Sequence, residues 1–282
     1  MIAVVAGLVT ALAWALATLA AARASRVLGP WSTTAWVVLI GLLVTVPLLV
    51  VAEPSGTLAA EDFAWLAIAG LGYTTGMVLN YSALSGGKIP VTAPIVSTEG
   101  TIAATLAVLT GEAATPLLGA MLVLIAVGVF VVVLQPGGGA DALSGEGARY
   151  VGFAVAAALV FGLGLYAAGR ASEGVPPSWV VAAGRIAGVA LLTVPLALSR
   201  RLRSGRAVLP YLVAAGVAEV AGVYTFAWGA RDSIAITAVL SSLFAVMAAI
   251  IAHALGERIS PRQWLGVGAV TVGVSVITVT RL

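Results

Sequence analysis

Residues 2–22 read IAVVAGLVTALAWALATLAAA, a stretch without a single charged side chain. A helix needs about 20 apolar residues to cross a bilayer, because about 30 Å of hydrocarbon is crossed at about 1.5 Å per residue. Similar runs recur along the chain, and they lack the alternation of a membrane β-strand. The predicted spans are roughly 2–22, 32–52, 63–85, 91–110, 115–134, 150–169, 178–198, 208–230, 235–255 and 261–280.

The composition of the 282-residue chain excludes most soluble functions. Apolar residues make up 61% of it and charged residues 9%, whereas soluble domains have about 45–50% and about 25%. A soluble enzyme, a disordered tail and a nucleic-acid-binding domain are therefore excluded. With no cysteine, one histidine and no phosphate-binding or hydrolase motif, the sequence predicts no metal, no cofactor and no catalysis. We predict an all-α, multi-pass membrane protein whose main partner is the lipid bilayer.

Lysine and arginine are unequally divided between the two sets of loops. Ten lie in the loops after spans 1, 3, 5, 7 and 9, and three lie on the opposite side. Basic loops stay in the cytoplasm. We therefore expect the cytoplasmic (inner) membrane as the location, with both termini outside, an assignment that depends heavily on the cluster Arg200–Arg206.

The two halves of the chain resemble each other at a separation of about 145–148 residues. Thr45-Val46-Pro47-Leu48 recurs as Thr193-Val194-Pro195-Leu196, and Gly111-Glu112 recurs as Gly256-Glu257. The matches keep the same order and nearly the same frame. They therefore indicate an internal repeat rather than coincidence.

Each half contains five predicted spans, and an odd number makes the second half enter the membrane from the opposite side. We predict two inverted repeats, residues 1–136 and 148–282, joined by a linker at 137–147 around a central cavity. Such symmetry lets a midplane site open alternately to each side of the membrane. It favours a carrier over a scaffold or an enzyme.

Several segments follow the pattern of a known family. Residues 224–244 read YTFAWGARDSIAITAVLSSLF, and residues 255–266 read LGERISPRQWLG. The first half contains Tyr81–Leu84 (YSAL), Ser97–Gly100 (STEG) and Gly111-Glu112 followed by Thr115-Pro116. Together they resemble two units of the EamA-type transporters of the drug/metabolite transporter superfamily, over essentially the whole chain.

This resemblance implies a ten-helix carrier with a cavity lined by helices 1, 3, 4, 6, 8 and 9. Members move small polar or amphipathic solutes, often outward, including amino acids, other metabolites and cationic drugs. The resemblance implies export of a small amino-acid-like or amphipathic metabolite by a secondary-active or facilitative carrier.

Two departures weaken a simple drug/proton antiport. The repeat partner of Glu99 is Phe244, and Trp14 and Phe161 stand where small four-helix relatives have an essential Glu. Proton-coupled efflux of cationic drugs stays an alternative, as does a non-transporting scaffold or intramembrane enzyme. Whether protons take part and which oligomer forms stay open.

Three charged residues fall well inside predicted spans, where an ionised group facing lipid costs about 2.5–3.5 kcal/mol. Glu99 either binds a substrate ammonium or takes up a proton, or it is a structural carboxylate bonded to Asn80 or Arg185. Arg185 binds a substrate carboxylate, pairs with Glu99 or Glu219, or extends to the outer interface. Glu219 is either a second carboxylate of the cavity, suited to proton coupling, or a partner of Arg185.

Further candidates are aromatic, hydroxyl and proline residues. Polar-tipped or aromatic walls of the cavity are expected from Trp14, Tyr73, Asn80, Tyr81, Tyr224 and Trp228, with helix packing as the alternative. Thr98 and Ser242 occupy matching places in the halves, and either offer hydroxyls to a ligand or bond back to the preceding turn. Pro47 and Pro195 are gating kinks or plain packing kinks. Glu112 and Glu257 are interpreted as packing and topological residues.

Overall fold

The computed structural model describes residues 1–51, 59–86, 89–113 and 145–254, with residues 115–117, 119–121, 123–124, 127, 265, 268–269, 272–273 and 276. All regular elements of these residues are helical. Among the described residues, six helical runs are long and apolar enough to cross a membrane. They are α1 (Ile2–Leu28), α2 (Pro30–Val51), α3 (Ala60–Gly86), α8 (Glu146–Gly174), the run α9 (Pro177–Gly188), η1 (Val189–Thr193) and α10 (Val194–Leu198), and η2 (Arg206–Val208) with α11 (Leu209–Ala230).

Two further predicted spans are each divided into two helices. The span at 91–110 becomes α4 (Ile89–Val96) and α5 (Glu99–Leu109), and the span at 235–255 becomes α12 (Ile234–Ser241) and α13 (Phe244–Ala254). The spans expected at 115–134 and 261–280 lie largely outside the described residues, as does the linker at 137–147. Ten spans therefore stay a prediction.

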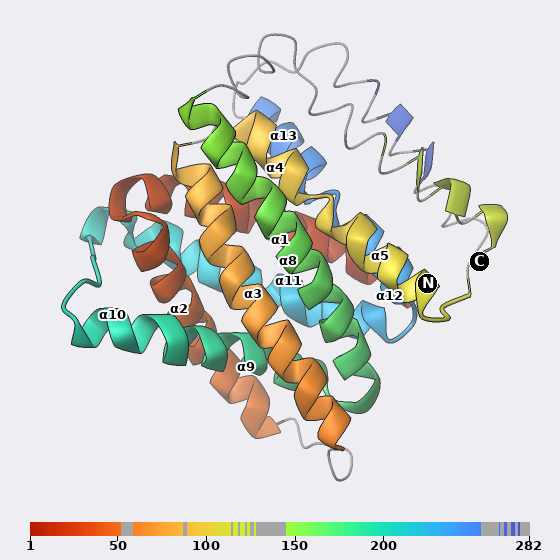
Figure 1. The fold of residues 1–282 in the computed structure, drawn as a ribbon, viewed down its shortest axis with the longest axis horizontal. Helices are drawn as coiled ribbons and strands as arrows, with labels where there is room; N and C mark the ends of the chain where they lie inside the picture. The colour runs from red at the N-terminus through yellow and green to blue at the C-terminus, as the bar shows by residue number, and fades with distance from the viewer. Residues whose placement is uncertain are drawn as a thin grey trace.

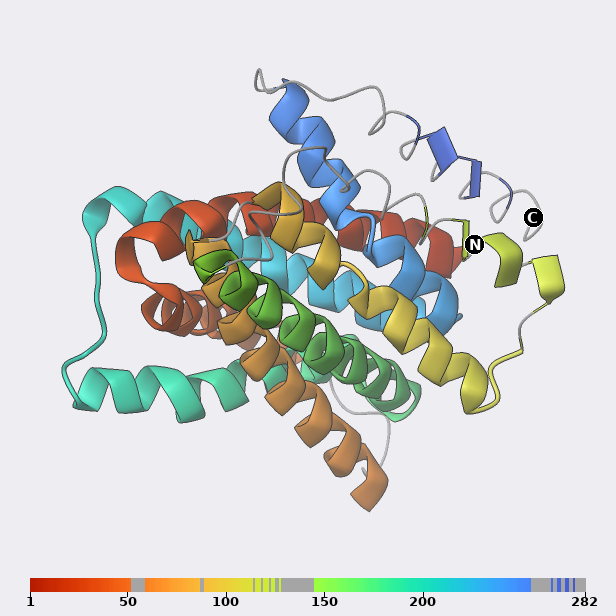
Figure 2. The same cartoon turned by 45° about the horizontal axis from the view of Figure 1, so that its top comes forward.

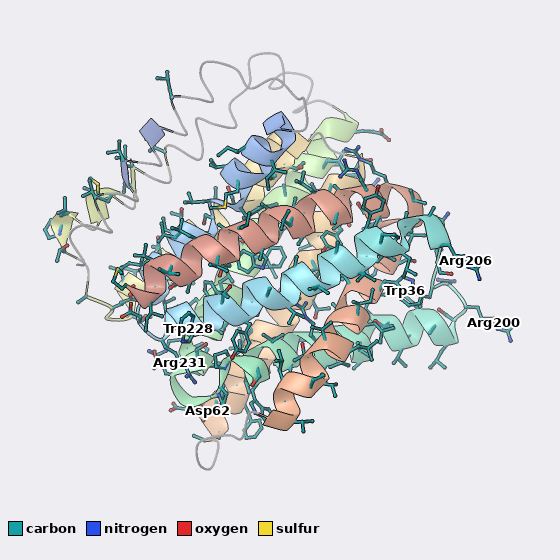
Figure 3. All side chains as sticks on the ribbon, turned by 180° about the vertical axis from the view of Figure 1, so that it is seen from behind. Trp36, Asp62, Arg200, Arg206, Trp228 and Arg231 are labelled. Carbon is teal, nitrogen blue, oxygen red and sulfur yellow. The ribbon has the colours of Figure 1, made fainter. Side chains whose placement is uncertain are left out.

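The two ends of the helix bundle differ in charge. Figure 3 shows Arg200 and Arg206 at one end, which we call the basic end, and Asp62 and Arg231 at the opposite, N-terminal end. At the basic end the indole N–H of Trp36 donates a hydrogen bond of 2.9 Å to a backbone carbonyl of the loop that follows α10. At the N-terminal end the ammonium of Met1 lies 3.5 Å from the carboxylate of Asp232.

Long helices from the two halves pack in antiparallel pairs, α3 with α8 and α1 with α11. Figures 1 and 2 show α3 and α8 side by side over much of their length. A Cβ atom at Gly72 would lie 3.0 Å from the Cα atom of Gly164, so these glycines let the α3 and α8 backbones approach closely. In α1 and α11, Trp14 lies against Gly222.

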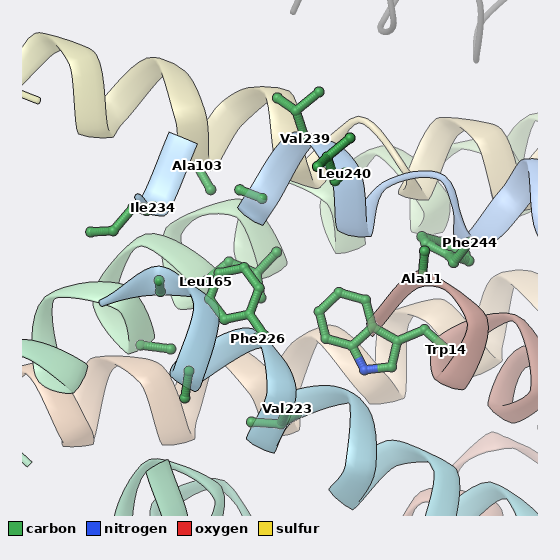
Figure 4. Packing of buried hydrophobic residues seen from close by; sticks show 14 of the residues in the cluster. Ala11, Trp14, Ala103, Leu165, Val223, Phe226, Ile234, Val239, Leu240 and Phe244 are labelled. Carbon is green, nitrogen blue, oxygen red and sulfur yellow. The ribbon is translucent and has the colours of Figure 1, made fainter. Parts of the chain in front are cut away.

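The outward faces of the helices are as apolar as the interior. On α1 the exposed side chains Val5, Val9, Leu12 and Leu16 follow the spacing of one helix face. Inside the bundle, Trp14 stacks with Phe226 at 6.1 Å between ring centroids (Figure 4). A bundle that is apolar on both faces is suited to lipid rather than water.

Candidate functional site

The two divided helices are interrupted at matching positions, Ser97–Thr98 and Ser242–Leu243. The Thr98 hydroxyl donates to the Ile95 carbonyl at 2.7 Å, and the Ser242 hydroxyl donates to the Ala238 carbonyl at 3.1 Å. These bonds satisfy backbone carbonyls of the preceding turns. Both hydroxyls therefore bond back to their own helix.

The interruptions meet where α5 crosses α12. A Cβ atom at Gly100 would overlap the Ser242 hydroxyl and the Ala238 carbonyl. Only glycine lets the two backbones come this close. The crossing fixes Glu99, the first residue of α5, in the interior, where its side chain is 4% exposed.

Glu99 faces a small cavity, which we call the acidic cavity. Its volume is about 30 Å³, room for about two water molecules. Among the described residues, neither the carboxylate of Glu99 nor the amide of Asn80 has a hydrogen-bond partner. The lining residues are Trp14, Thr18, Tyr73, Asn80, Val96, Glu99, Phe161, Leu165, Glu219 and Phe244.

A second cavity of about 30 Å³, the arginine cavity, lies nearer the N-terminal end. It shares Tyr73, Phe161 and Leu165 with the acidic cavity. Apart from the Arg185 guanidinium and the Tyr73 hydroxyl, its side chains are apolar. The lining residues are Ala69, Tyr73, Phe161, Gly164, Leu165, Ala168, Val180, Val181, Gly184, Arg185, Val223 and Phe226.

Tyr73 separates an acidic group from a basic group. Its hydroxyl donates a hydrogen bond of 2.6 Å to Oε2 of Glu219. The Cζ atom of Arg185 lies 4.4 Å from the centroid of its ring, within the range of a cation–π contact. The hydroxyl of Tyr73 therefore donates a hydrogen bond to a carboxylate from α11, while its ring covers a guanidinium from α9.

Arg185 is buried, with 1% of its surface exposed. The alternative that this side chain extends to the membrane interface is therefore contradicted. Its Nε, Nη1 and Nη2 atoms have no hydrogen-bond partner, and it forms no ion pair with a described carboxylate. The expected pairing with Glu99 or Glu219 is absent from the described part of the chain.

The structure does not bring Tyr224 and Trp228 to either cavity. Their side chains are 38% and 45% exposed, on the same outward face of α11 as Val213 and Val217. At about 100° per residue, Tyr224 lies about 140° around α11 from Glu219, and Trp228 lies about 180° around it. These angles can be calculated from the sequence alone, and they favour lipid-facing positions for Tyr224 and Trp228.

Tyr81, Pro47 and Pro195 also lie away from the two cavities. Tyr81 is buried in a second apolar cluster with Met77 and Leu84, and its hydroxyl has no partner among the described residues. Pro47 lies within α2, and Pro195 follows the π-helical turn η1. The π turn gives helix α9–α10 a local irregularity at the expected kink.

Among the apolar residues that line the cavities, Leu165 and Phe226 were not candidates in the sequence analysis, and Phe161 was noted there only where small relatives have a Glu. Phe161 and Leu165 lie four residues apart on α8 and line both cavities. Phe226 lies seven residues after Glu219 and therefore on the same face of α11. Their helical spacing from charged or aromatic candidates is the signal that could have identified them.

The halves of the divided helices are arranged unequally at the two ends of the bundle. At the N-terminal end α5 packs along α12, whereas nearer the basic end α4 and α13 have little contact. Glu112, just after α5, accepts hydrogen bonds from the Ser233 hydroxyl and, at 3.2 Å, from the Ala235 amide at the start of α12. The N-terminal end is therefore closed by a contact between the two halves.

The fold and these buried charged groups define a multi-pass helical membrane protein. The sequence matches the model of the EamA-like transporter family over residues 1–134 and 148–279. The match covers most of the chain, which therefore belongs to the EamA-like transporter family. The family assignment agrees with the resemblance found in the sequence.

One solved crystal structure, described only as that of a protein, has the same fold. Its TM-score is 0.77 at 22% sequence identity, over 99% of this chain and 96% of that chain. At this identity the likeness concerns the fold alone. No curated protein matches the sequence.

Proposed function

We propose that the protein is a secondary-active or facilitative carrier that exports a small amino-acid-like or amphipathic metabolite by alternating access. Membership of a transporter family supports the transport class. The observation that carries the proposal is the interior group of Glu99, Glu219 and Arg185, which come from different helices and lie around Tyr73, with Glu99 and Arg185 buried and Glu219 partly buried. Ionisable groups inside a membrane bundle are costly and are retained mainly where a solute or ion is handled.

The unequal ends of the bundle support alternating access. In two inverted repeats, residues 1–136 and 148–282, the contact of α5 with α12 at one end corresponds to a contact of α4 with α13 at the other. In the described conformation α5 and α12 are in contact, whereas α4 and α13 have little contact. Exchange between the two arrangements would open the interior to each side in turn.

We place the basic end in the cytoplasm of a cell whose inner membrane holds the protein, because basic loops stay on that side. The chain has no cysteine, so a single introduced thiol reports only its own position. A membrane-impermeant thiol reagent added to intact cells would label Glu173→Cys at the N-terminal end and spare Ser204→Cys at the basic end. The reverse pattern would invert the proposed orientation.

Both charge signs at the site favour a zwitterion. A carboxylate on the solute would be attracted to Arg185, and an ammonium would be attracted to Glu219 and Glu99. The aromatic side chains of Tyr73, Trp14 and Phe161 give the surroundings an amphipathic character. This combination suits an amino-acid-like solute better than a simple cation.

Counterflow in proteoliposomes tests this function. Purified protein is reconstituted in liposomes loaded with a mixture of unlabelled amino acids, and the entry of labelled leucine is followed with and without a pH gradient. Transient accumulation above that of protein-free liposomes supports the carrier. If no member of a broad metabolite panel moves, the carrier proposal fails and a scaffold or an intramembrane enzyme is favoured.

A second candidate, proton-coupled efflux of a cationic compound, is favoured by two acids at one cavity against a single base. Glu99 has no hydrogen-bond donor among the described residues, so its carboxylate is available to a proton or a cation. Under this alternative Glu99→Gln abolishes pH-dependent entry of tetraphenylphosphonium, whereas Glu61→Gln, an exposed acid on α3, has no effect. If Glu99 is structural instead, Glu99→Gln lowers the unfolding temperature.

A further inference from the structure

The guanidinium of Arg185 is the buried cation whose hydrogen-bonding capacity is left unused. All three of its nitrogens lie in the interior, and none reaches an acceptor among the described residues. A buried charge without a partner is strongly unfavourable, and such groups are normally compensated by an anion or by hydrogen bonds. Partial compensation comes from the face of the Tyr73 ring, at 4.4 Å, and from the nearby negative charge of Glu219.

The surroundings hold Arg185 in place without neutralising it. Gly41 of α2 lies flat against the side chain, since a Cβ atom there would lie 2.8 Å from Nε. The nearby carboxylate of Glu219 accepts its hydrogen bond from Tyr73 and forms no ion pair with Arg185. The guanidinium is therefore positioned and available for an anion.

The cavity beside Arg185 indicates the kind of anion. Its walls include Val180, Val181, Val223 and Phe226. Figure 4 shows Leu165, Val223 and Phe226 close to one another in the packed interior. The other polar group of this cavity, the Tyr73 hydroxyl, already donates to Glu219, so an inorganic ion would have little polar contact there besides Arg185. An organic carboxylate places its charge on the planar guanidinium, which suits bidentate contact, and its hydrocarbon part on the apolar wall.

The position of Arg185 along α9 argues against a lipid headgroup. Arg185 lies eight residues after Pro177, which begins the helix, so it is about 12 Å along the helix axis from that end. With 1% of its surface exposed, it is closed to lipid in this conformation. An anion must therefore arrive through the interior of the bundle.

We propose that Arg185 binds the carboxylate of the transported solute, and that the apolar part of the solute occupies the arginine cavity. This inference rests on the proposed transport function and names the chemical class of its substrate: a carboxylate joined to a branched or aromatic hydrocarbon body. The two cavities hold only about two water molecules each. A solute of this class therefore requires the cavity to widen when it binds.

Three probes with the same hydrocarbon body separate the charges. They are leucine, with both charges, 4-methylpentanoate, with the carboxylate alone, and 3-methylbutylamine, with the ammonium alone. Binding to the purified full chain is measured by the shift of thermal unfolding, followed by tryptophan fluorescence. We expect leucine and 4-methylpentanoate to stabilise the protein clearly, and 3-methylbutylamine, which lacks the carboxylate, to stabilise it less.

Substitutions at position 185 test whether stabilisation by the probes depends on Arg185. Arg185→Gln weakens the binding of 4-methylpentanoate by at least about tenfold, because it removes a charged partner. Arg185→Lys keeps the charge without the planar fork and gives an intermediate loss. The matched control is Arg206→Gln at the exposed basic end, which leaves binding unchanged. Arg185→Met removes the charge but keeps a side chain of similar volume. If this variant folds in normal yield but does not bind the probe, the loss of binding is not a result of misfolding.

Three results would each overturn the inference. The first is binding of 3-methylbutylamine but not of 4-methylpentanoate. The second is binding of 4-methylpentanoate by Arg185→Gln as tight as by the wild type, and the third is stabilisation by chloride equal to that by 4-methylpentanoate at the same concentration. The last would reveal a simple inorganic anion site. Failure of the transport function looks different. In that case 4-methylpentanoate still binds through Arg185, but no probe crosses the liposome membrane.

Discussion

Glu112 of the first half of the chain accepts a hydrogen bond from the hydroxyl of Ser233 in the second half. The same carboxylate accepts the backbone amide of Ala235 at 3.2 Å, so it caps the N-terminus of α12. Free amides and the helix dipole make such a terminus attractive to a negative charge. The contact therefore joins the two halves at the N-terminal end, where α5 and α12 pack together.

Removing the charge of Glu112 should loosen this end of the bundle. Glu112→Gln keeps the shape and replaces a charged acceptor by a neutral one, which costs about 1 kcal/mol, or about fivefold in the closed population. The readout is a single cysteine at Ala103, a fully buried residue of α5. We expect its reaction with a hydrophilic thiol reagent to be about fivefold faster in the variant.

The control for this comparison is Glu173→Gln. Glu173 is an acid at the same end whose side chain is 52% exposed and paired only with Arg170. Its loss should leave the reactivity at position 103 unchanged. An unchanged rate in Glu112→Gln itself would show that the capping contact does not hold the end closed.

Tyr73→Phe removes the hydroxyl that donates to Glu219 and keeps the ring that covers Arg185. Glu219 is partly buried, and the loss of its donor destabilises the fold by about 1 kcal/mol or more. Thermal unfolding should therefore begin several degrees lower than in the wild type. Tyr211→Phe, which alters a tyrosine 39% exposed near the basic end, is the matched control. Equal unfolding temperatures in both variants would contradict the role assigned to the hydroxyl.

Gly100→Ala should damage the crossing of α5 and α12. The added methyl group overlaps the Ser242 hydroxyl and the Ala238 carbonyl, and the carbonyl cannot rotate away. Overpacking of this kind costs about 1–3 kcal/mol or more. We expect a lower folded yield and a lower unfolding temperature. Gly152→Ala, where a Cβ atom meets nothing within 4 Å, should be neutral, and matching behaviour of the two variants would refute the close crossing.

Gly41→Ala tests the position of Arg185 without changing any charge. The methyl group would lie 2.8 Å from Nε of Arg185, so the guanidinium must shift, and a flexible side chain does so at little cost. We expect the folded yield to stay near that of Gly152→Ala, while the affinity for 4-methylpentanoate falls severalfold. Titration of the unfolding temperature with this probe measures the change. An affinity equal to the wild-type value would mean that the guanidinium does not contact the probe.

The apolar runs of the sequence were sufficient to predict the long helices. The span expected at 208–230 corresponds to α11 (Leu209–Ala230), and the span at 178–198 corresponds to the run that begins at Pro177. The interruptions in the spans at 91–110 and 235–255 were not predicted. Hydropathy records only that these residues are apolar, whereas the interruptions depend on hydroxyls that bond to the preceding turn and on a crossing at Gly100.

The charged candidate residues could be identified from the sequence, but their contacts could not. The cost of an ionised group in lipid identifies Glu99, Arg185 and Glu219 from the sequence alone. That Tyr73 would lie between Arg185 and Glu219 depends on how α3, α9 and α11 pack, which no local pattern encodes. Glu112 likewise reaches Ser233 only because α5 and α12 end up side by side.

Reversible bridging of Glu112 and Ser233 tests the central claim, alternating access between two inverted halves, most directly. The double variant Glu112→Cys/Ser233→Cys is joined by a short bifunctional thiol reagent in proteoliposomes, and leucine counterflow is measured before bridging, after it and after reduction. The account predicts that bridging stops exchange by the double variant, that reduction restores it, and that the reagent does not change the exchange rate of either single cysteine variant. Undiminished exchange in the fully bridged protein would contradict it.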